Sequence, residues 1–91
     1  MNVKEAVRAA KTHIQDLFAD EGISNMGLEE VEFEDSTGAW KVTVGFSRPW
    51  DRVPIAFAAI AQAATPRSYK VVRIDDATGR IVAVKNREGT S

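Results

Sequence analysis

The residues able to do acid–base or metal chemistry are few along this 91-residue chain. His13 is the one histidine and there is no cysteine, so a histidine-ligated metal site or a nucleophilic triad would have to be built around a single imidazole. No glycine-flanked serine elbow, phosphate-binding loop or dinucleotide fingerprint is present. We therefore interpret His13 as a solvated helix residue and predict no metal, no cofactor and no catalytic residue.

Two groups of carboxylates are the remaining candidates for chemistry. Glu30, Glu32 and Glu34 alternate with apolar residues in EEVEFED, so they share one face of an extended strand. Asp75 and Asp76 are adjacent in DDATG, which lacks the spaced oxygen ligands and the closing glutamate of a calcium loop. We interpret the three glutamates as a solvent-facing strand surface and the two aspartates as turn residues.

The N-terminal stretch has the pattern of an amphipathic helix. Apolar residues between Val3 and Phe18 recur at intervals of three and four, and charged residues occupy the other faces. Asn2 is a candidate N-cap, and Gly22 suits the left-handed position that follows a helix. We predict a helix over residues 3–20, whose apolar stripe must pack against another element.

Two β-hairpins are predicted from alternating apolar residues. The first covers residues 29–47 and turns at DSTG, and the second covers residues 68–86 and turns at DATG. The register expected for the second hairpin places Ile74 opposite Val82 and Val72 opposite Val84. The expected sheet side of the core comprises Val31, Phe33, Trp40, Val42, Val44, Phe46, Val72, Ile74, Val82 and Val84.

The segment between the hairpins is apolar and rich in alanine. It carries no charge from Val53 to Thr65, and alanine favours a helix, which Pro66 would end. We predict a short helix over residues 54–64. A helix that is apolar on all sides is either buried or part of an interface, so we name Trp50, Phe57 and Ile60 as candidate partner-binding residues.

The string YKVVRIDDATGRIVAV resembles the signature hairpin of PepSY-type domains, with Tyr69, Asp76, Thr78 and Gly79 as its fixed points. PepSY-type domains are similar to the broader cystatin-like layout, in which an antiparallel sheet curves around one helix that packs on its face. The resemblance implies a binding or regulatory role and supplies no catalytic residue. Tyr69 and Arg73, on the sheet face expected to be exposed, complete the candidate partner-binding set.

The chain has a net charge of −1, but its charges are unevenly distributed. Residues 20–35 hold seven acidic residues and no basic one, whereas residues 67–91 hold six basic and three acidic residues. We interpret this as an acidic strand near a basic hairpin, because cross-strand pairs of opposite charge are common in sheets. The alternative is a nucleic-acid-binding hairpin that uses Tyr69 for stacking, although the negative net charge argues against it.

The stretch MNVKEAVRAAKTHIQDLF has no apolar signal-peptide core, and no part of the chain reaches the roughly 18–20 apolar residues that span a bilayer. We therefore expect a cytoplasmic protein with no membrane partner, folded as one domain over residues 1–91.

The sequence thus predicts an α+β fold, in which an N-terminal helix packs on a four-stranded antiparallel sheet made of two hairpins joined by a short alanine-rich helix. The predicted function is a non-catalytic protein-binding or regulatory module, whose simplest partner is a second copy of the chain. Two alternatives stay open. One is the nucleic-acid-binding hairpin, and the other is a small enzyme or ligand-binding domain with a pocket between helix and sheet.

Overall fold

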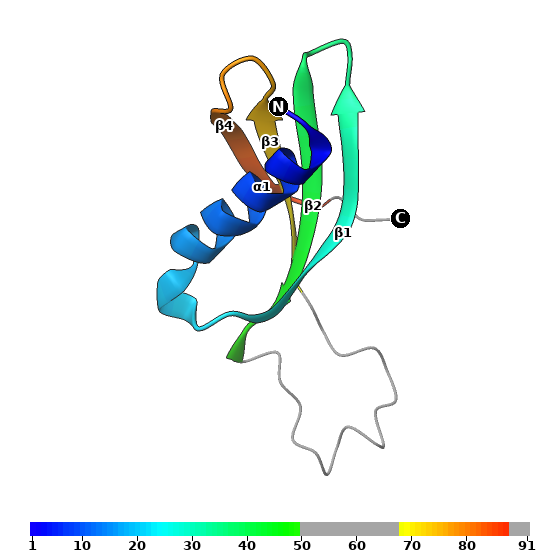
Figure 1. Cartoon of the computed structure of the whole chain (residues 1–91). Helices are drawn as coiled ribbons and strands as arrows, with labels where there is room; N and C mark the ends of the chain where they lie inside the picture. The colour runs from blue at the N-terminus through cyan, green and yellow to red at the C-terminus, as the bar shows by residue number, and fades with distance from the viewer. Residues whose placement is uncertain (50–67, 88–91) are drawn as a thin grey trace.

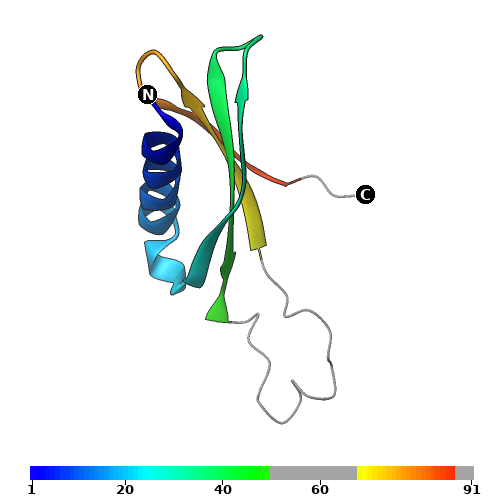
Figure 2. The ribbon, with the colours of Figure 1, turned by 45° about the vertical axis from the view of Figure 1, so that its right-hand side comes forward.

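A computed structural model describes residues 1–49 and 68–87 of the chain. Its elements are α1 (Val3–Leu17), the short 3₁₀-helix η1 (Ala19–Glu21), β1 (Ser24–Glu34), β2 (Ala39–Ser47), β3 (Ser68–Asp75) and β4 (Ile81–Asn86). The strands form one antiparallel sheet in the order β1-β2-β3-β4, and α1 covers one face of it (Figure 1). The helix and the sheet make two layers (Figure 2). The predicted α+β architecture is confirmed, and the helix predicted over residues 54–64 lies outside the described residues.

Helix α1 begins with a capping box. The Asn2 side chain accepts a hydrogen bond from the Glu5 backbone N–H at 2.8 Å, and the Glu5 carboxylate accepts one from the Asn2 backbone N–H at 2.8 Å. The helix ends at Leu17, three residues before the predicted end at 20. Phe18 leaves helical geometry, and its ring packs beside Phe46 with the ring centroids 5.4 Å apart. Gly22 has φ of 63°, as expected for a stop signal.

Strand β1 begins at Ser24, five residues before the predicted hairpin at 29. Its pairing with β2 is irregular between Ser24 and Gly27 and again between Leu28 and Glu30. Each irregularity adds a residue that breaks the period of two, so the alternation on which the prediction relied was absent there. The longest regular stretch of the pairing covers residues 30–34.

The register of the second hairpin is confirmed at one pair and wrong at the next. Val72 lies opposite Val84 as predicted, but Ile74 lies opposite Ile81, not Val82. The pairing shifts between Arg73 and Ile74, which places one extra residue in β4. Val82 is consequently 60% exposed and does not belong to the core, contrary to the prediction.

The core lies between α1 and the middle of the sheet. Its fully buried members are Ala6, Ala10, Ile14, Val42, Val44, Phe46, Val72 and Ile74. The two alanines let the helix approach the sheet closely, because they add no side-chain bulk beyond a methyl group. The predicted core residues Val31, Trp40 and Val84 are only partly buried. Phe33, which was also predicted to be in the core, is 40% exposed. Its ring packs beside the Trp40 ring, with the centroids 5.1 Å apart.

Candidate functional site

Three of the five predicted partner-binding residues, Trp50, Phe57 and Ile60, lie outside the described residues. Tyr69 and Arg73 lie on β3, on the face turned away from α1, and each is engaged within the protein. The Arg87 guanidinium lies over the Tyr69 ring, 4.3 Å from its centroid. Arg73 Nη2 donates to Glu34 Oε1 at 3.2 Å.

The open face of the sheet is an ion-pair network. Glu34 is its centre, because Lys41 Nζ lies 3.8 Å from its carboxylate and Arg73 contacts the same group. Lys41 also lies 3.9 Å from Glu32. A hydrogen bond from the Thr37 hydroxyl is the largest cause that holds the pKa of Glu34 below its ordinary value, and the two cations add to it. The network therefore keeps this carboxylate ionised.

The basic side chains of the second hairpin do not form one stripe. Lys70 Nζ lies 5.6 Å from the centroid of the Phe18 ring, on the α1 side of the sheet. Arg73 lies on the opposite face and is paired with Glu34, while Arg80 belongs to the β3–β4 turn. Lys85 and Arg87 line the open face together with Arg73, so three of the five cations share one face, while Lys70 and Arg80 lie elsewhere.

The aspartates of DDATG hold the β3–β4 turn, as their interpretation as turn residues predicted. Asp75 Oδ2 accepts hydrogen bonds from the Thr78 N–H at 3.0 Å and from its hydroxyl at 2.8 Å. Asp76 Oδ1 accepts one from Trp40 Nε1 at 2.9 Å and lies 3.4 Å from the Met1 amino group. In residues 1–49 and 68–87 no cluster of three or more histidine, cysteine, aspartate or glutamate side chains could hold a metal ion. His13 is half-buried on α1.

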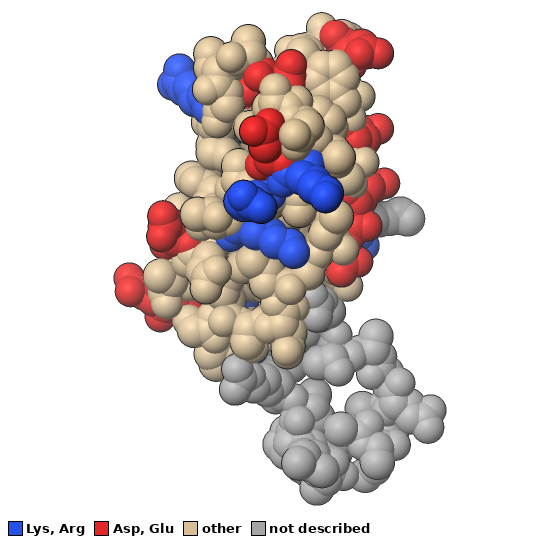
Figure 3. Space-filling view, viewed as in Figure 1, with Lys and Arg blue, Asp and Glu red and all other residues tan. Residues whose placement is uncertain are grey.

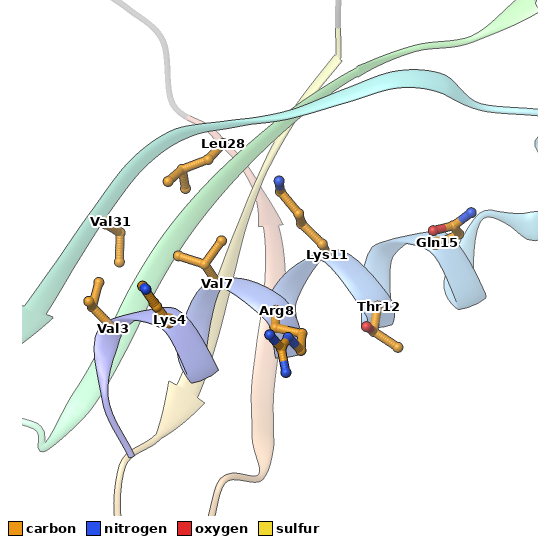
Figure 4. A pocket seen from close by; sticks show the side chains of 9 residues that line it. All are labelled: Val3, Lys4, Val7, Arg8, Lys11, Thr12, Gln15, Leu28 and Val31. Carbon is orange, nitrogen blue, oxygen red and sulfur yellow. The ribbon is translucent and has the colours of Figure 1, made fainter.

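A groove of about 540 Å³ runs between α1 and β1. Val3 and Val7 form its floor from the helix side, and Leu28 and Val31 form it from the strand side. Figure 4 shows these four side chains directed toward the space between the two elements. Val3 is 45% and Leu28 is 42% exposed, so apolar surface is open to solvent along the groove.

The rim of this α1–β1 groove is basic. Lys4, Arg8 and Lys11 line it, together with Thr12 and Gln15. Lys4 and Lys11 extend toward β1, whereas Arg8 lies at the outer side of the helix (Figure 4). On the space-filling surface, basic side chains gather over α1 and acidic side chains follow the β1 edge (Figure 3). No acidic side chain of the described ranges forms a salt bridge with any of the three cations.

Sequence reasoning assigned these cations to the polar side of α1 and Val31 to the core, so it missed the groove. The signal available was the spacing of Lys4, Arg8 and Lys11 at intervals of four and three, which places them on one side of a helix. The spacing could not show that this side borders β1. The groove lies between helix and sheet, and the ligand-binding alternative stays a prediction.

Comparison with known proteins finds no matching family model, no similar curated protein and no similar solved structure. The fold shown is an α+β arrangement of an N-terminal helix on a four-stranded antiparallel sheet, and the likeness to PepSY-type domains beyond this stays a prediction. None of the helices in the described ranges is both long enough and apolar enough to cross a membrane.

Proposed function

We propose that the protein is a non-catalytic binding module, cystatin-like in layout, which recognises an anionic and partly apolar partner in the α1–β1 groove. The observation that carries the proposal is the combination of an exposed apolar floor with three basic side chains that have no ion-pair partner among the described residues. Apolar surface supplies affinity once it is buried, and charge at the rim orients the partner and speeds its arrival.

The placement of the three cations supports this proposal, because their charges do not stabilise helix α1. Lys4 lies in the first turn of α1, where the helix dipole is positive. Lys4 and Arg8 are four residues apart and Arg8 and Lys11 three apart, so like charges are neighbours along the helix surface. A bound anionic group would relieve both of these unfavourable interactions.

The carboxylates support a role without catalysis. A general acid that works near neutral pH needs a raised pKa, whereas the pKa of Glu34 is lowered by its hydrogen bond with Thr37 and by its cations. Asp75 holds the β3–β4 turn through Thr78, and Asp76 joins that turn to Trp40. Each of these groups has a structural task that accounts for its position.

The proposal can be tested with anilinonaphthalene sulfonate, a small probe that is both anionic and apolar. We expect saturable binding at one site, with amide NMR shifts concentrated at Val3, Val7, Leu28 and Val31. The Leu28→Glu variant should bind the probe about tenfold more weakly or worse, because it places a negative charge on the groove floor. The matched control is Val82→Glu, which makes the same change at an exposed strand residue outside the groove.

Both variants must first show the near-UV as well as the far-UV circular dichroism of the folded protein, since partly folded states that keep only the far-UV signal also bind this probe. Equal probe binding by the wild type, Leu28→Glu and Val82→Glu would refute the groove as the recognition site. Two results would favour the other predicted functions. Self-association that Leu28→Glu leaves unchanged would favour a homodimer through another surface, and binding to duplex DNA would favour the nucleic-acid alternative.

A further inference from the structure

The α1–β1 groove is bordered by an unpaired sheet edge. In the order β1-β2-β3-β4, β1 has a neighbour on one side only among the described strands. Its regular part, residues 30–34, includes Val31, which also forms part of the groove floor. Backbone N–H and C=O groups along such an edge are a template for a further strand. A ligand in the groove therefore has an apolar floor, a basic rim and a ladder of backbone partners within reach.

The spread of the cations favours a ligand with more than one negative charge. Lys4 and Lys11 are seven residues apart, or about 10.5 Å along the helix axis. Carboxylates two or four residues apart on one face of a strand are about 7 or 14 Å apart, which brackets this distance. A lysine side chain is flexible enough to cover the difference. A single headgroup, such as that of a fatty acid, has one charge for three cations.

The two faces of β1 differ in charge, which restricts the orientation of an added strand. Val31 faces α1, whereas Glu30 and Glu32 line the opposite, open face of the sheet. Carboxylates of an added strand would be attracted by Lys4 and Lys11 on the α1 side and repelled by the glutamates on the other side. Acidic and apolar side chains must therefore alternate with neutral or basic ones.

We infer that the occupant of the groove is an extended acidic segment of another protein, which adds to the free edge of β1. Its apolar side chains contact Val3, Val7 and Leu28, and its carboxylates on the same face pair with Lys4 and Lys11. This inference rests on the proposed function, because it specifies the partner of that site. A bilayer fits less well, because the site is a groove between two elements and not a flat surface.

The test uses a fluorescein-labelled peptide about eight residues long, a usual strand length, in which threonine alternates with glutamate and leucine. A second peptide has lysine in place of each glutamate. We expect one-to-one binding of the glutamate peptide by fluorescence anisotropy, and about tenfold weaker binding or worse for the lysine peptide. Binding should weaken with added salt. Hydrogen exchange of the outward-facing amides within residues 30–34 should slow when the peptide is bound.

Charge-reversal variants test whether the peptide binds in the groove. Lys11→Glu should weaken binding of the glutamate peptide about tenfold, since an attraction becomes a repulsion, and Lys4→Glu should act in the same direction. Arg80→Glu is the matched control, because it makes the same charge change in the β3–β4 turn, outside the groove. Arg80→Glu should leave the affinity within about twofold of wild type.

The outcomes separate this inference from the proposed function. If anilinonaphthalene sulfonate binds the groove but neither peptide does, the proposed function stands and the peptide inference fails. If Lys11→Glu and Arg80→Glu weaken peptide binding equally, the peptide is not in the groove and the inference fails. Binding to vesicles of phosphatidylglycerol and phosphatidylcholine that Lys11→Glu abolishes, without peptide binding, would assign the groove to a membrane surface. Failure of the small probe and of both peptides would overturn both proposals.

Discussion

Trp40 on β2 donates a hydrogen bond from its indole N–H to the Asp76 carboxylate at 2.9 Å, and so ties the two hairpin turns together. A backbone bond lies beside it, from the Asp76 N–H to the Gly38 carbonyl at 3.0 Å. The first turn belongs to β1–β2 and the second to β3–β4, so these two bonds hold together the ends of hairpins that are far apart in sequence. The indole also packs beside the Phe33 ring, with the ring planes inclined by 57°.

Removal of the indole N–H should destabilise the protein. Trp40→Phe keeps a ring for Phe33 to stack on but removes the donor, so we expect a lower urea midpoint. Asp76→Ala should lower the midpoint as well. Because both changes break the same hydrogen bond, the double variant should be less destabilised than the sum of the two single variants. Additive effects in urea titrations of all four proteins would show that the bond contributes nothing to stability.

Acid should destabilise the protein through Asp76. The hydrogen bond from Trp40 is the largest cause that lowers the pKa of Asp76 below its ordinary value of 3.8, and the amino group of Met1 adds to it. A carboxyl whose pKa is lower in the folded than in the unfolded state contributes stability that is fully present above its unfolded pKa. That contribution is lost progressively as the pH falls below about 4 and then through the lower pKa that Asp76 has in the folded state.

The urea midpoint of the wild type should decrease as the pH is lowered below about 4. The decrease should be shallower in Asp76→Asn than in the wild type. Glu34, whose pKa is also lowered, should behave in the same way in Glu34→Gln. At pH 7 both variants should be less stable than the wild type, because each lacks a stabilising ionised group, and this difference should shrink as the pH falls. A wild-type curve of urea midpoint against pH that runs parallel to both variant curves between about pH 2 and pH 5 would contradict this prediction.

The corrected register of β4 predicts unequal costs for neighbouring substitutions. Ile81 lies opposite the fully buried Ile74, whereas Val82 is 60% exposed. Ile81→Ala should reduce the free energy of unfolding by about 1–2 kcal/mol, since it removes partly buried methyl and methylene groups. Val82→Ala should change it by less than about 0.5 kcal/mol. The reverse order of the two losses in urea denaturation would restore the originally predicted register.

The capping box of α1 should contribute measurable stability. Asn2→Ala removes the acceptor of the Glu5 N–H and should cost about 1 kcal/mol of unfolding free energy. Asn2→Asp keeps an acceptor at the same place and adds a favourable charge at the helix N-terminus, so it should be neutral or stabilising. Thermal denaturation by circular dichroism measures both. An equal loss in the two variants would indicate that the side-chain oxygen at residue 2 has no capping role.

Periodicity and turn chemistry were enough to predict most of the fold. The 3.6-residue spacing from Val3 onward, the strict alternation in β2 and the two glycine-containing turns each carry a local signal, because the chain geometry alone dictates which residues share a face. The prediction failed where the backbone departs from regular geometry. The bulges in β1 and β4 shift the faces by one residue, and this shift moved Ile81 into the place expected for Val82.

The candidate site depended on tertiary structure. From the sequence alone, Lys4, Arg8 and Lys11 are ordinary residues on the polar side of an amphipathic helix, and Leu28 lies in a stretch without clear alternation. They become a groove because Ala6, Ala10 and Ile14 seat the helix over the centre of the sheet and leave the edge strand beside it uncovered. The sequence determined which face of each element is apolar. The packing angle and offset of the helix decided which apolar side chains were left uncovered, since these depend on contacts between residues distant in sequence.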